Sequence, residues 1–300
     1  MIMRISISLL CLALMLSTIT TTAHQGPQRI KVFISADMEG ISGIVHSDQT
    51  SAGGSEYGRA RKLMTDEVNA AIDGALMGGA TEIIVNDSHG SMRNLILEEL
   101  HPPARLISNF FKPMGMMQGL DQSFNAVFFI GYHAKAGSPV GVLAHTGSGA
   151  VADLKINGVS VGEAGMNIHA AGALGVPVVL ITGDQVAVAQ AKELVDNIEG
   201  VVVKQAIGTQ AAELVHPEQS HKMIREAARN VVQRLSEFKP YRLPPPYRFE
   251  ITFSNTSLAD IAEQIPTVAR QGPRTVEYMT QDYLQGYRLL RVLYRYLRAD

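Results

Sequence analysis

Short apolar runs that alternate with amphipathic segments are the feature that most constrains the fold of this chain. The runs are rich in β-branched residues and lie at Ile30–Ser35, Glu82–Val85, Ala126–Ile130, Val176–Ile181 and Val201–Val203. Apolar residues on both faces indicate strands buried on both sides, as in a parallel sheet. Tyr57–Met77 instead repeats apolar residues at helical spacing. We therefore expect an α/β fold with a mostly parallel sheet flanked by helices.

A β-hairpin interrupts this alternation. Asn157-Gly158 lies between β-type residues of Ala150–Ser160, which is a strong hairpin signal. A helix rich in small residues, Gly162–Leu174, follows it.

The last part of the chain has its own organisation. Four prolines fall within 239–247 and predict an extended linker. A strand, a helix, a second strand and a final helix are expected after it. We therefore predict a main α/β domain over 24–238, the linker, and a small C-terminal α/β subdomain over 248–300 that packs on the main domain.

The first 23 residues resemble a signal peptide. Arg4 precedes an apolar run, Ile5–Met15, and a small residue, Ala23, follows a polar stretch. The run is shorter than the roughly 20 residues of a membrane span. We expect export, to the periplasm or the medium, and no membrane attachment after cleavage. Cys11, the one cysteine, lies in this segment, so metal sites in the mature chain must use His, Asp and Glu.

The charge balance excludes some partners. The chain has 26 basic and 28 acidic residues and shows no basic stripe. Nucleic acids and anionic membranes need such a stripe, and neither is expected to bind.

Two acidic residues follow the first expected strand. Asp37 and Glu39 are two positions apart, so in extended chain their carboxylates point the same way. Ligands of open α/β sheets bind outside the carboxyl ends of strands. Carboxylates that close repel unless a cation or proton lies between them. The pair is therefore either a metal site or an ordinary solvated loop.

Two histidines lie just beyond other strands. His89 and His133 each follow an apolar run, and imidazole is the commonest metal ligand. Glu163 is at the start of the small-residue helix. It is either a metal ligand or only a favourable charge at the N-terminal end of the helix dipole. His145 lies among glycines, either in a flexible loop or as a catalytic group near the metals.

Together these residues resemble the M55 peptidase family of zinc D-aminopeptidases. The pieces that carry the resemblance span most of the chain from Ile30 onward and are Asp37–Gly43, Val85–His89, Gly131–Ala134 and Val161–Glu163, with Leu100–Pro102 and Val203–Gln205 in addition.

The resemblance implies an aminopeptidase that removes N-terminal D-residues such as D-Ala from short peptides or amides. It implies two Zn²⁺ ions per chain, with Asp37 bridging them and Glu39, His89, His133 and Glu163 as the other ligands. Mn²⁺ or Co²⁺ also suits this donor set. His145 corresponds to a nucleophile or base. The resemblance also implies a homo-oligomeric ring, such as a decamer.

Two other readings compete with a peptidase. Another metal-dependent hydrolase, an amidase or phosphatase, can use a similar sheet. A phosphatase needs cations near the ligands, and only Arg93 and Lys135 are close in sequence. An exported, non-enzymatic peptide- or metal-binding protein is the second alternative, in which His145 has no catalytic role.

Overall fold

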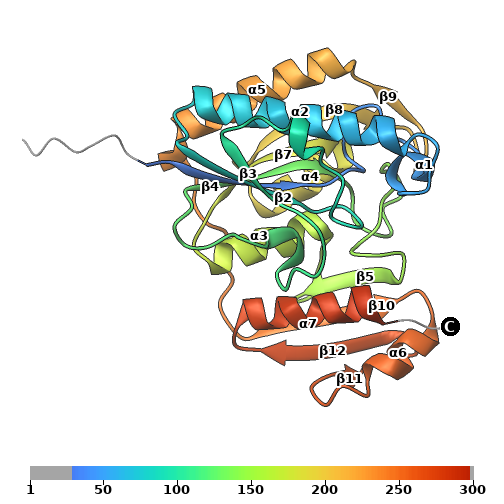
Figure 1. Ribbon diagram of the computed structural model, residues 1–300. Helices are drawn as coiled ribbons and strands as arrows, with labels where there is room; N and C mark the ends of the chain where they lie inside the picture. The colour runs from blue at the N-terminus through green and yellow to red at the C-terminus, as the bar shows by residue number, and fades with distance from the viewer. Residues whose placement is uncertain (1–28, 298–300) are drawn as a thin grey trace, which may run out of the picture.

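The computed structural model describes residues 29–297, and its larger part is a seven-stranded sheet between helices (Figure 1). The signal peptide expected at 1–23 lies outside the described residues. The strand order is β3-β2-β1-β4-β7-β8-β9, all parallel except β9. The strands are β1 (Lys31–Ala36), β2 (Glu82–Asp87), β3 (Ala104–Ile107), β4 (Ala126–Tyr132), β7 (Val178–Asp184), β8 (Glu199–Ala206) and β9 (Ala212–Leu214).

Helices cover both faces of this sheet, which explains why its central strands β1, β4 and β7 are buried on both faces. The pair α2 (Tyr57–Met77) and α5 (Pro217–Gln233) packs on one face, while α3 (Glu163–Ala173) and α4 (Gln185–Leu194) pack on the other. Short helical segments complete this part: α1 (Ser47–Thr50), η1 (Leu97–Glu99), η2 (Gly115–Met117) and η3 (Leu235–Glu237). The α/β class is confirmed.

A second, antiparallel sheet lies beyond α3 (Figure 1). Its order is β11-β12-β10-β5-β6. The elements are β5 (Val151–Ile156), β6 (Val159–Ser160), β10 (Tyr247–Phe253), α6 (Thr256–Ala262), β11 (Ala269–Arg270), β12 (Thr275–Thr280) and α7 (Tyr283–Tyr296).

This second sheet joins two distant parts of the sequence. The hairpin β5–β6 forms as expected, with positive φ angles at Asn157 (50°) and Gly158 (86°). Strand β10 then pairs with β5, so the C-terminal strands extend the sheet that the hairpin begins. Residues 239–246 form no helix or strand. The domain boundaries given above stay a prediction.

The order of the parallel strands creates a crevice. From β1 the chain adds β2 and β3 on one side, and later adds β4, β7 and β8 on the other. The loops that follow β1 and β4 therefore leave the same edge in opposite directions, which is where open α/β sheets bind ligands. In the described part of the chain, no helix is both long and apolar enough for a membrane span.

A buried lysine stabilises the loop after β1. The Nζ of Lys204, in β8, donates hydrogen bonds to the carbonyls of Glu39, Ile41 and Ile44. Burial lowers the pKa of Lys204 to about 8, although the charge of nearby Glu67 opposes this. Lys204 thus ties the loop that carries two of the expected ligands to a strand on the other side of the crevice.

Replacing this lysine is expected to destabilise the protein. Lys204→Met leaves the carbonyls of Glu39 and Ile44 without a donor and that of Ile41 with only the amide of Ile44, so the free energy of unfolding should fall by about 2–4 kcal/mol. Denaturant unfolding of the variant measures this, with Lys222→Met on the exposed side of α5 as the control. An unchanged unfolding free energy in Lys204→Met would show that the loop does not depend on this contact.

Candidate functional site

The loop after β1 lies against the end of β4. The amide of Asp37 donates to the carbonyl of Ile130, and that of Gly40 to Gly131, both at 2.8 Å. A Cβ at position 40 would lie 2.0 Å from the carbonyl oxygen of Tyr132, so only glycine permits this approach. The contact brings Asp37 and Glu39 close to His133, which follows β4.

The structure brings all five expected ligands together at this edge. His89 Nδ1 lies 2.9 Å from Glu39 Oε2 and 3.4 Å from Asp37 Oδ1. His133 Nε2 lies 3.3 Å from Asp37 Oδ2 and 3.5 Å from Glu163 Oε2. All five residues are buried. Residues far apart in the sequence therefore form one compact polar cluster.

Backbone carbonyls orient the histidine rings. His89 donates from Nε2 to the carbonyl of Thr50 at 2.8 Å, and His133 from Nδ1 to that of Ala134 at 2.9 Å. Each ring thereby turns its other nitrogen toward the carboxylates. Metal-bound histidines show this arrangement, in which a hydrogen bond on one nitrogen fixes the tautomer and leaves the other for the ion.

His145 lies at the edge of the same cluster. Its ring stacks on that of His133 with centroids 4.1 Å apart and an interplanar angle of 10°. Its Nδ1 donates to the carbonyl of Leu143 at 2.9 Å, and its Nε2 lies 3.4 Å from Glu163 Oε1. The His145 side chain is 29% exposed, whereas that of His133 is 1% exposed. His145 is therefore the histidine of the cluster that is most open to solvent.

The charges of the cluster shift its pKa values strongly. For Glu39, His89, His133 and Glu163, burial disfavours the charged form, but the pairing of acids with imidazoles outweighs it. The pKa values of His89 and His133 are raised well above the usual value, chiefly by Glu39 and Glu163 respectively. The pKa of Glu39 is lowered well below the usual value by His89, and His133 lowers that of Glu163 to about 2. Positive charge is thus strongly favoured between these carboxylates.

The residues present fit metal ions. Asp37 Oδ2 and His133 Nε2 are buried and have no hydrogen-bond partner within residues 29–297. Asp37, Glu39 and His133 can each offer one donor atom within 4.8 Å of the others, and so can His133, His145 and Glu163. Such a set of imidazoles and carboxylates suits zinc. Two unpaired buried polar atoms that face each other are costly unless a proton or a metal cation lies between them.

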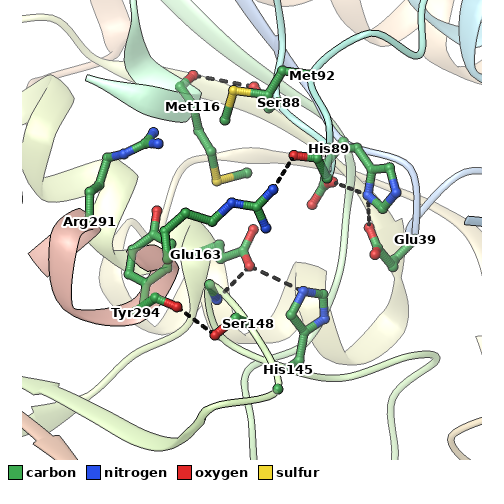
Figure 2. A pocket seen from close by; sticks show the side chains of 15 residues that line it. Glu39, Ser88, His89, Met92, Met116, His145, Ser148, Glu163, Arg291 and Tyr294 are labelled. Carbon is green, nitrogen blue, oxygen red and sulfur yellow. Dashed lines mark hydrogen bonds and ion pairs between the residues drawn. The ribbon is translucent and has the colours of Figure 1, made fainter. Parts of the chain in front are cut away.

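The cluster opens into a cavity of about 270 Å³. Asp37, Glu39, His89, His145 and Glu163 line one part of it. The opposite wall includes Arg291, Tyr294 and Arg295 of α7, as Figure 2 shows for the first two. The sequence interpretation missed these α7 residues. Its argument against a phosphatase was that cations near the ligands are few, and this argument is wrong because two arginines line the cavity.

A family comparison decides between the remaining readings. The family model described as D-aminopeptidase, Peptidase_M55, matches residues 30–292. The chain belongs to the M55 family of peptidases. The match covers both sheets and every residue of the cluster. An M55 member is a hydrolase, so the non-enzymatic reading no longer holds.

Two comparisons with individual M55 proteins agree. The chain is 39% identical to the D-aminopeptidase of Bacillus subtilis (strain 168) over 267 residues, which is 88% of this chain and 96% of that protein. The structure matches that of the Zn-dependent D-aminopeptidase DppA from Bacillus subtilis, a self-compartmentalizing protease. That match has a TM-score of 0.86 at 37% identity and covers 88% of this chain and 96% of the other.

Proposed function

We propose that this M55 peptidase is a metal-dependent aminopeptidase that removes N-terminal D-residues, D-Ala foremost, from short peptides or amides. The observation that carries the proposal is the buried convergence of three carboxylates and two imidazoles, with Asp37 Oδ2 and His133 Nε2 lacking any other partner within residues 29–297. The similarity to D-aminopeptidases of Bacillus subtilis supports the handedness of the substrate.

Two zinc ions are proposed for the cluster. Asp37 would hold both, because its two oxygens face different imidazoles: Oδ1 faces His89 and Oδ2 faces His133. Glu39 lies with His89, and Glu163 lies with His133. Two divalent ions about 3.5–4 Å apart are typical of aminopeptidase sites. When bound, they supply Lewis-acid polarisation of the scissile carbonyl and lower the pKa of water.

His145 is proposed as the group that moves the proton. Its Nδ1 hydrogen bond to the Leu143 carbonyl directs Nε2 toward Glu163 and the cavity. Nε2 can accept a proton from the attacking water and return it to the leaving amine, which is the general base and then general acid role. Direct attack by His145 on the carbonyl is the other role open to a histidine at this place.

The experiment that tests this function combines a substrate panel with metal removal. We expect D-Ala-D-Ala and D-alanine amide to be cleaved at least tenfold faster than their L counterparts, and a chelator to abolish turnover until zinc is restored. Mn²⁺ and Co²⁺ are tested in the same way. An aryl phosphate is included as a substrate, because the two arginines that line the cavity would also suit a phosphatase. Turnover of the phosphate alone, or chelator-resistant peptidase activity, would refute the proposal.

Export and assembly complete the proposal. The N-terminal 23 residues support export to the periplasm or medium, where short D-alanyl peptides are the expected substrates. Large apolar side chains are exposed at Phe111 and Ile207, to 60% and 71%. These side chains, together with the self-compartmentalizing relative, support a homo-oligomer, with a ring of the decamer type as the specific form. Light scattering of the purified protein measures its mass directly.

A further inference from the structure

The wall of the cavity opposite the carboxylate cluster holds a buried guanidinium that forms no ion pair within residues 29–297. Arg291 is 2% exposed, and within residues 29–297 no carboxylate lies within ion-pair distance of it. Its Nε and Nη1 atoms are buried and have no hydrogen-bond partner in the same part of the chain. A buried guanidinium in this state costs several kcal/mol. A polar group left this way calls for an explanation, and a missing ligand is one.

The position of Arg291 is fixed by its helix. Tyr287, one turn earlier in α7, donates a hydrogen bond from its hydroxyl to Asn167 Oδ1 of α3 at 2.6 Å, and Tyr283 donates to the carbonyl of Met166. The same face of α7 therefore carries Arg291 toward the cavity. At Gly115 a Cβ would lie 1.3 Å from the Nη1 atom, so a glycine makes room for the guanidinium.

Acidic and basic side chains line opposite sides of the cavity. Asp37, Glu39 and Glu163 lie on one side, and Arg291 lies on the other, as Figure 2 shows for Glu39 and Arg291. Arg295 adds a second cation and donates to the carbonyl of Gly90 at 2.9 Å. A short peptide that binds with its amino end at the metal cluster carries its carboxylate at the opposite end, toward Arg291. An extended dipeptide spans about 7 Å between them.

We propose that Arg291 binds a carboxylate of the substrate and thereby makes the enzyme selective for short peptides with a free carboxyl end. Guanidinium groups bind carboxylates through two parallel hydrogen bonds, and Nη2 can form such a pair with Nε or with Nη1, neither of which has a hydrogen-bond partner among the described residues. The terminal carboxylate of a dipeptide or an acidic side chain in the second residue can supply the group. The inference rests on the proposed function. It assigns a binding residue to the carboxyl end of the substrate, which lies away from the metal cluster.

The test compares three substrates: D-Ala-D-Ala, its C-terminal amide, and the C-terminal amide of D-Ala-D-Glu. We expect kcat/KM to be about 10- to 100-fold higher for D-Ala-D-Ala than for its amide, the range given by a charged hydrogen bond. In Arg291→Met this preference should disappear, because kcat/KM should fall for D-Ala-D-Ala and stay unchanged for its amide. If the native enzyme prefers the C-terminal amide of D-Ala-D-Glu over that of D-Ala-D-Ala, an acidic side chain in the second residue can supply the carboxylate that Arg291 binds.

Controls separate this role from a structural one. Arg288→Met, on the exposed side of the same helix, should keep the native preference. If Arg291→Met does not fold, Arg291→Lys takes its place in the test. Lysine keeps the positive charge but cannot form two parallel hydrogen bonds, so the preference for D-Ala-D-Ala should be intermediate. Equal loss on all three substrates, or an unchanged preference in Arg291→Met, would overturn the inference.

A binding measurement keeps the inference separate from the peptidase proposal. If the zinc-loaded enzyme cleaves none of the three substrates, the proposed function fails. Calorimetric titration with the intact D-Ala-D-Ala and its amide then decides the role of Arg291. Tenfold tighter binding of the free acid, lost in Arg291→Met, supports it, and equal binding of both overturns it.

Discussion

Asp37→Ala should lose its bound metal and nearly all of its turnover. Among residues 29–297, Asp37 is the one acid within 3.4 Å of both His89 and His133, so its removal takes away the group proposed to bridge two ions. Metal ions contribute several kcal/mol of transition-state stabilisation, so kcat/KM should fall by at least about 1,000-fold. Metal analysis of the purified variant should give less than one zinc per chain, against two in the native enzyme.

Two further variants make this result specific. Asp37→Asn keeps the size of the side chain and should also lose metal, because an amide carries no negative charge. Asp196→Asn, at an exposed position, should retain both ions and full activity. If Asp37→Ala still holds two ions per chain, Asp37 does not bridge them.

His145→Ala should lose turnover while it keeps its metal. The ring is partly exposed and makes one hydrogen bond to a backbone carbonyl, so its removal should leave the fold intact. Loss of a general acid–base group costs about 100- to 10,000-fold in kcat. Steady-state kinetics and metal analysis of the same preparation measure both effects.

The structure gives this experiment a second informative outcome. His145 can offer a donor atom within 4.8 Å of those of His133 and Glu163, so it is also close enough to act as a ligand. If His145→Ala loses both one metal ion and its activity, His145 is a metal ligand. If the variant keeps full activity, His145 has no catalytic role. His101→Ala is the matched control, because His101 pairs with Asp73 and does not line the cavity.

The sequence predicted the parallel sheet well because its strands are buried on both faces. The helix expected over Tyr57–Met77 has those bounds in the structure, and the runs that predict β1, β2 and β4 are each within two residues of the observed strands at both ends. Strand β3 was missed because its side chains are only partly buried, which weakens the apolar pattern. The pairing of β10 with β5 was missed because strand order between distant segments leaves no local pattern.

The site could be anticipated only where it follows strands or begins a helix. Asp37, His89 and His133 come directly after apolar runs, so the topology of a parallel sheet brings them to one edge. Their assignment as metal ligands stays a prediction, although the structure places them together. Arg291 was missed, and Lys204 was given only as part of a family-like stretch without a role, yet each is a cation at an inward position of an otherwise apolar pattern. A charged residue that interrupts an apolar face in this way is a signal that the amino-acid pattern itself carries.

The two sheets contribute different parts of the cavity. Groups proposed to carry the reaction come from loops at the edge of the parallel sheet and the start of α3, while the opposite wall comes from α7, which packs against β10 and β12 of the antiparallel sheet. Substitutions in α7 can therefore change which peptides are accepted without moving the reacting groups. Differences in substrate range among related enzymes should consequently concentrate in the last helix.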